Sequence, residues 1–210
     1  MNSGTFPDFL GTVSVIHRPG NTVVATIPVG NFPQGIAITP DGTQAYVANS
    51  NDATVSVIDT ATNTVAGLPI PVGQGPDWVA VNPNGTQAYV TNGGLSGTVS
   101  VIKTANRAVV AAIPVGSSPL GVAFTPDGTH AYVTNYGSNT VSVIATASNT
   151  VVATVPVDSP FGVAVSPNGQ DGYVSKITNT DKVRVIATAT NTKVAVIPVG
   201  ASPRGVAIGP

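Results

Sequence analysis

Short apolar runs alternate with polar turn residues along the chain, and a group of four such runs returns at a fixed distance. One complete group has its apolar runs at residues 121–125, 130–135, 140–144 and 150–157. Each run is rich in Val, Ile, Ala and Thr and is bounded by Gly, Pro, Asn or Asp, a pattern typical of strands joined by tight turns. Each group therefore predicts four short antiparallel strands.

The tyrosines give the period of this repeat. The intervals between successive tyrosines are 43, 43 and 41 residues, at Tyr46, Tyr89, Tyr132 and Tyr173. The segment PVG keeps the same spacing, beginning at Pro28, Pro71, Pro114 and Pro198, and a PVD variant begins at Pro156. Four strands in a repeat of about 40–45 residues are the content of a propeller blade.

The turn between the first two strands of each unit has its own local signal. In TPDG at residues 125–128, Pro126 sets φ for a type I turn and Gly128 supplies the left-handed residue that follows. The same turn is predicted at Pro40, Pro83 and Pro167. In TVSVI at residues 140–144 both faces are mildly apolar, as expected of a sheet that packs against a neighbour on each side.

The composition supports an all-β chain and argues against a nucleic-acid partner and against insertion into a membrane. The 42% hydrophobic content consists mainly of Val, Ala and Ile, which suits strands better than helices. Only 8% of the residues are charged, the net charge is -1 and every acidic residue is Asp, so we expect no nucleic-acid partner. No run approaches about 18 apolar residues and the first ten residues do not form a signal peptide, so no membrane insertion is expected.

We therefore expect one domain over residues 1–210, an all-β, five-bladed β-propeller of four-stranded antiparallel blades. Four blades are predicted at residues 31–73, 74–116, 117–158 and 159–200. The fifth would close the ring by combining residues 205–210 with residues 1–30. In that blade, residues 205–208 would be innermost, 3–8 second, and 12–16 and 22–29 outermost. Such mixed closure would hide sheet edges that could pair with another chain.

A family resemblance rests on the second strand of each unit. AYVTN at residues 88–92 and 131–135 and AYVAN at 45–49, within the longer pattern PDGTxAYV followed by NTVSVI, resemble the YVTN-repeat β-propellers. That family includes archaeal and bacterial surface-layer proteins, and related propellers more often have seven blades. The resemblance covers nearly the whole chain, although the last full unit has drifted to DGYVSKITNTDKVRVI. It implies an extracellular or cell-surface location and a role as an interaction scaffold.

Positions that differ between otherwise equal units are candidates for binding. The loop into the first strand reads PVGxxPxG, and the residue before its last Gly varies: Gln34, Asp77, Leu120, Phe161 and Arg204. Because the first strand of a blade lines the axis, we expect these residues to ring one mouth of the central channel. The alternative is that each fills its own gap, with Asp77 and Arg204 forming a weak exposed ion pair.

Trp78 is the only Trp of the chain and stands where the other units have Gly. It is expected either to fill a void or to offer an aromatic platform at the mouth. With it, the candidate ligand-binding set is Gln34, Asp77, Trp78, Leu120, Phe161 and Arg204.

Signals for catalysis are sparse, and we assign no catalytic residue, metal site or cofactor. The chain has no Cys, no Glu, and none of the G-x-S-x-G, P-loop or H-E-x-x-H motifs. His130 occupies the position of Gln in three other units and is interpreted as a solvated polar residue. The charges of Lys176, Lys182 and Arg184 are interpreted as a solvated face.

The sequence thus favours a non-enzymatic binding or architectural module for a protein or glycan partner, as a monomer or, alternatively, a strand-exchanged oligomer. One alternative is a propeller that binds a small molecule, or acts as a hydrolase or lyase, at the channel mouth. Another is an engineered or trimmed repeat protein with no function beyond folding.

Overall fold

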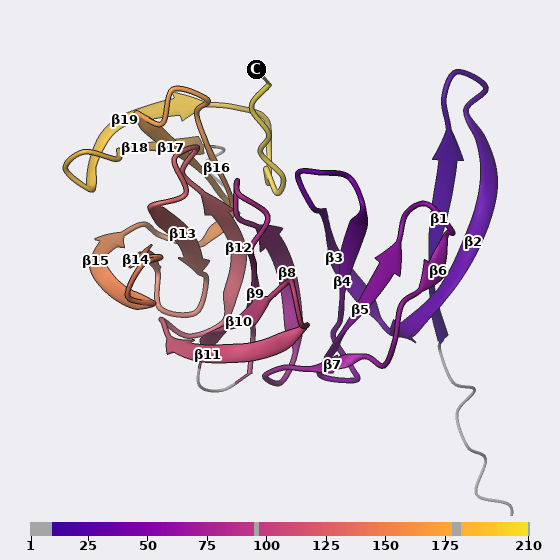
Figure 1. Ribbon diagram of the computed structural model, residues 1–210. Coiled ribbons are helices and arrows are strands. Elements are labelled where there is room, and N and C mark those ends of the chain that lie inside the picture. Colours follow the sequence, from indigo (N-terminus) through magenta and orange to yellow (C-terminus); the bar gives the residue numbers. More distant parts are fainter. Residues whose placement is uncertain (1–9, 95–96, 178–181, 210) are drawn as a thin grey trace, which may run out of the picture.

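The computed structural model describes residues 10–94, 97–177 and 182–209, which form five antiparallel sheets (Figure 1). The first sheet is a hairpin of β1 (Leu10–His17) and β2 (Thr22–Asn31). The described residues contain no helix, and hence none able to cross a membrane. The expectation of an all-β fold is confirmed.

Four larger sheets follow in chain order, each counted here as a blade. The first blade contains β3 (Pro33–Ile38), β4 (Gln44–Asn49), β5 (Thr54–Asp59), β6 (Thr64–Val65) and β7 (Ile70–Pro71). The second contains β8 (Pro76–Val81), β9 (Gln87–Asn92), β10 (Thr98–Lys103) and β11 (Ala108–Pro114). The third contains β12 (Pro119–Phe124), β13 (His130–Asn135), β14 (Thr140–Ala145) and β15 (Thr150–Pro156). The fourth contains β16 (Pro160–Val165), β17 (Asp171–Lys176), β18 (Lys182–Ala187) and β19 (Thr192–Pro198).

Each blade runs from an inner to an outer strand. Within a blade the strands pair in chain order, and β3, β8, β12 and β16 contact one another in succession from blade to blade. These first strands therefore form the inner edge of the curved array (Figure 1). In the first blade β6 and β7 together take the place of one outer strand, on either side of the 88% exposed Leu68.

The predicted turns have the expected backbone. Gly42, Gly85, Gly128 and Gly169 have φ between +69° and +73°, the left-handed region in which Gly is least strained. In the third blade the Gly128 N–H donates to Thr125 O at 2.8 Å, which closes the type I turn. The turn prediction is confirmed in all four blades.

The core lies between the blades rather than inside any one of them. Tyr132, Val141 and Val143 of the third blade pack against residues of the fourth, among them Val174 and Ile186, and all five are at most 1% exposed. A similar cluster around Tyr89 joins the second blade to the third. Both faces of the middle strands are buried, as the TVSVI pattern predicts.

The described ends of the chain do not join in one sheet. β1 pairs with β2 alone, and residues 205–208 form no strand. Residues 3–8, expected as the second strand of a closing blade, lie outside the described residues. The C-terminal segment borders β16, because a Cβ added to Gly162 would lie 2.5 Å from Arg204 O. Figure 1 shows this segment well separated from the β1–β2 hairpin, which packs against the first blade instead.

Candidate functional site

The six candidate residues occupy the inner edge of the array, and we call them the inner rim. Gln34 lies on β3, Asp77 and Trp78 on β8, Leu120 on β12 and Phe161 on β16, and Arg204 lies in the segment after β19. Neighbouring rim positions approach closely. A Cβ on Gly35 would lie 2.7 Å from Asp77 O, and one on Gly121 would lie 2.9 Å from Phe161 O. The fold thus sets residues of successive blades side by side.

A hydroxyl group from the preceding blade holds most of the rim backbone in place. Thr91 and Thr134 each donate their hydroxyl to the rim carbonyl of the next blade, Leu120 O and Phe161 O, at 2.6 Å. Ser175 donates to Arg204 O, in the segment after β19, at 2.7 Å. The first blade has Ala48 at this position, so Asp77 O lacks such a donor. The Thr of the YVTN motif was the sequence signal for this link, but sequence reasoning did not identify its role.

The rim side chains differ in their surroundings. The Arg204 guanidinium carbon lies 5.7 Å from the centre of the Phe161 ring, a cation–π distance. The ion pair expected between Asp77 and Arg204 is not formed, since among the described residues the Asp77 carboxyl has neither an ion-pair nor a hydrogen-bond partner. Partial burial raises the pKa of this carboxyl. Gln34 is exposed and Leu120 half-buried.

Trp78 is held through its backbone, while its side chain is partly exposed. Its backbone N–H donates to Thr91 Oγ1 at 3.0 Å, so the strand is tied to β9 at this point. The side chain remains 39% exposed. The pairing of β8 with β9 is irregular between Pro76 and Val79, and this interrupts the usual alternation of side chains next to Asp77.

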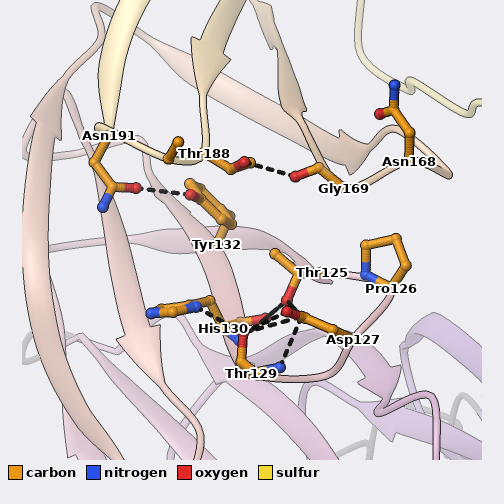
Figure 2. Close-up of a pocket in the computed structure, with 11 residues that line it drawn as sticks. Thr125, Pro126, Asp127, Thr129, His130, Tyr132, Asn168, Gly169, Thr188 and Asn191 are labelled. Carbon is orange, nitrogen blue, oxygen red and sulfur yellow. Dashed lines mark hydrogen bonds between the residues drawn. The ribbon is translucent and has the colours of Figure 1, made fainter.

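A cavity of about 470 Å³ lies elsewhere, between the third and fourth blades at their turns. Figure 2 shows Asp127 and His130 on one side of it and Thr188 and Asn191 on the other. His130 Nδ1 lies 2.9 Å from Thr129 Oγ1. His130 is therefore a partly exposed residue that lines an open cavity.

Most polar groups of this cavity belong to the repeated architecture. Hydrogen bonds from Thr125 and Thr129 lower the pKa of Asp127, which keeps it a carboxylate. Asp41 accepts equivalent bonds in the first blade. The residue at the position of His130 varies, because the first two blades have Gln there and the fourth has Asp171 rather than the neighbouring Gln170 that the sequence aligned with it. Within residues 10–94, 97–177 and 182–209, no three acidic or His side chains gather as a metal site.

The comparisons with known proteins agree with this architecture. The family described as "Lactonase, 7-bladed beta-propeller" matches residues 58–172, more than half of the chain. A structure of hydrazine synthase from Kuenenia stuttgartiensis is similar with a TM-score of 0.74 and 29% identity, covering 78% of this chain and 48% of that one. The chain thus spans about half the length of that relative.

A functionally unknown protein from Desulfotomaculum acetoxidans DSM 771 superposes with a TM-score of 0.85 at 16% identity, covering 97% of this chain and 68% of that one. This likeness shows the fold alone. No protein with a curated description matches the sequence.

Proposed function

The chain belongs to the lactonase seven-bladed β-propeller family, and from this premise we propose that it is a binding module whose inner rim holds a glycan outside the cell or on its surface. Stacked blades present the rim on a rigid scaffold, so binding orders few groups. The resemblance to YVTN-repeat surface proteins supports the location.

The observation that carries this proposal is the unpartnered carboxyl of Asp77. Partial burial without a hydrogen bond from the described residues disfavours the charged form of this carboxyl, and a ligand that donates O–H or N–H groups would offset that effect. Next to it, Trp78 exposes part of an apolar aromatic surface. Sugars offer both hydroxyl donors and an apolar C–H face, and this combination favours a glycan over a peptide.

Binding of the full chain to peptidoglycan and to chitooligosaccharides, measured by sedimentation and calorimetry, tests this function. Asp77→Asn removes the charge with little change of shape, and Trp78→Gly introduces the residue of the other blades. Each is expected to weaken binding about tenfold or more. The exposed Lys103→Ala serves as a control and should bind normally. Equal binding by all variants, or binding of peptides only, would exclude glycan recognition at the rim.

A second candidate function is hydrolysis of a lactone, favoured by the family match together with the cavity at His130. The imidazole would act as a general base, taking a proton from the water that attacks the lactone carbonyl. The measurement is the rate of hydrolysis of glucono-δ-lactone and of dihydrocoumarin, monitored through the protons that are released. His130→Gln, which introduces the residue of the first two blades, should lower kcat about 100-fold or more. An unchanged rate would remove this candidate.

A further inference from the structure

In three blades a neutral polar ladder joins the second and third strands. Asn135 Nδ2 donates to Thr140 Oγ1 at 3.1 Å and to Ser142 Oγ at 2.9 Å. Asn49 and Asn92 make the same two bonds in their blades. In the loop that leads into each of these blades, a Gly lies against the Asn. In the third blade, for example, a Cβ added to Gly116 would lie 2.7 Å from Asn135 Cβ. The first three blades thus have only neutral side chains and a Gly at these positions.

The fourth blade replaces every member of this ladder by a charged residue. Lys176 stands in place of Asn, Lys182 in place of Thr and Arg184 in place of Ser, while Asp158 replaces the Gly. The register is the same as in the third blade: Lys176 is opposite Lys182, as Asn135 is opposite Thr140. The three basic side chains therefore share one face of the sheet. Lys193 joins them at the position that Val151 has in the third blade.

We name these four residues the cation cluster (Lys176, Lys182, Arg184 and Lys193), and three of them, Lys176, Arg184 and Lys193, act on the Asp158 carboxylate. Lys176 Nζ lies 3.2 Å from Asp158 Oδ2, and its side chain is only 5% exposed. The interpretation of this group as a solvated face is therefore wrong for Lys176. The Lys176 hydrogen bond and charge lower the pKa of Asp158, and the charges of Arg184 and Lys193 add to this.

Within the described part of the chain, the cation cluster has few acidic partners. Among the described residues, Asp158 is the only acid that forms an ion pair with it. Arg184 Nε is buried and has no hydrogen-bond partner. Like charges on directly opposed strand residues, such as Lys176 and Lys182, are destabilising. An arrangement of this kind is stabilised if an anion binds beside Asp158.

The repeat also indicates where such an anion would sit. In the third blade the equivalent place is a recess of about 360 Å³, lined by Gly116, Thr140, Ser142 and Val151 among others. The fourth blade has Asp158, Lys182, Arg184 and Lys193 at these four positions. Three cationic side chains thus stand where neutral side chains line a recess in the neighbouring blade.

We propose that the fourth blade binds a tetrahedral oxyanion, a phosphate or sulfate group, through Lys182, Arg184 and Lys193 beside the Lys176–Asp158 pair. The Arg guanidinium can donate two parallel hydrogen bonds to such a group, and the Lys ammonium groups act as point charges. The site is separate from the inner rim and does not depend on the function proposed there.

The repeat supplies the variant that tests this site. Lys182→Thr with Arg184→Ser restores the side chains that fill these positions in the other three blades. Thermal unfolding of the full chain is measured in sodium phosphate, sodium sulfate and sodium chloride at constant ionic strength. The wild type should show a saturable rise of Tm with phosphate or sulfate but not with chloride, and the double variant should bind at least about tenfold more weakly. Lys103→Thr, an exposed charge on another blade, should respond as the wild type does.

Two outcomes would overturn the proposal: a wild type with no saturable response, or a double variant with an unchanged one. In chloride, the double variant should also be more stable than the wild type, because it removes two of the basic side chains that repel one another. Equal stability of the two proteins would contradict this repulsion. Binding of dextran sulfate, compared with inorganic phosphate and sulfate, distinguishes an oxyanion carried on a polymer from a free ion. Loss of both in the double variant assigns both to this site.

Discussion

At the residue scale, one hydroxyl in each of three blades joins two neighbouring blades at the rim. Thr134 Oγ1 accepts from the Gly121 N–H at 2.8 Å and donates to Phe161 O at 2.6 Å. The side chain is fully buried, so neither partner can be replaced by bulk water if the hydroxyl is lost. Ser175 makes the same link in the fourth blade, whereas Ala48 of the first blade cannot.

Thr134→Ala should therefore lower the free energy of unfolding by about 1–3 kcal/mol, because two buried backbone groups lose their partner. Urea unfolding at neutral pH measures the effect. Thr134→Ser keeps the hydroxyl and should lose clearly less. If the Ala and Ser variants unfold at the same urea concentration, the hydroxyl link does not stabilise the interface.

A second residue-scale contact predicts a dependence on alkaline pH. Tyr132 is 1% exposed and donates its hydroxyl to Asn191 Oδ1 at 2.7 Å, and burial raises its pKa from 10.0 to about 12. The unfolded chain ionises first, so the stabilisation is complete below pH 10 and is lost as pH rises to about 12.

The loss between pH 9 and 12 should be about 2 kcal/mol for this tyrosine. Tyr132→Phe should be less stable than the wild type at pH 8, through the lost hydrogen bond, but should lose less stability on going to pH 11.5. Urea unfolding at both pH values provides the comparison. Parallel pH profiles for the two proteins would show that Tyr132 does not contribute.

At the element scale, the inner strands of three blades pack too closely for a Cβ at one position of the repeat, whereas the second blade has Trp78 there. Added Cβ atoms on Gly35, Gly121 and Gly162 would lie 2.5–2.9 Å from a backbone oxygen of the next inner segment. Gly205 has the same position in the repeat but nothing within 4 Å. The requirement therefore comes from the neighbouring strand and not from the turn.

Gly162→Ala should destabilise the protein by about 1–3 kcal/mol, because strand and segment must move apart. Gly205→Ala is the matched control and should change the unfolding midpoint little. Chemical denaturation of both variants is the measurement. A similar cost for both would mean that the close approach at Gly162 is relieved without strain.

At the scale of the whole molecule, the described blades form a curved array with two unlike ends. The three interfaces between successive blades are closed by buried apolar side chains. By contrast, every residue of β19, the last strand of the fourth blade, is exposed. Much of β2 is also exposed. Stability should therefore fall from the middle blades toward the ends.

Hydrogen exchange should show this gradient directly. Amides of β1, β2 and β19 are expected to exchange on the order of 100-fold faster than those of β9, β10, β13 and β14. Exchange followed by mass spectrometry on the full chain resolves these segments. Equal protection of β19 and β14 would indicate that the ends are covered in solution.

Much of the architecture could be predicted, and the candidate site only in part. The repeat located the strands and the Pro-Asp-Gly turns, because hydrophobic period and turn chemistry are local properties. Variation at a repeated position identified Asp77 and Arg204 as rim residues, but not that Arg204 would lie over Phe161. The basic residues of the fourth blade were noticed in sequence, while their common face became evident only from the register of β17 and β18.

The sequence by itself determined the unit of this protein: four strands, their turns and the two apolar faces that oblige each sheet to pack against others. Only the tertiary structure decided which residues of different blades meet, such as Tyr132 with Asn191, and that the described ends remain apart. The reason is physical. A strand or turn depends on its own few residues, whereas the angle between blades results from how whole buried faces pack, and this angle sets both the inner rim and the distance between the ends.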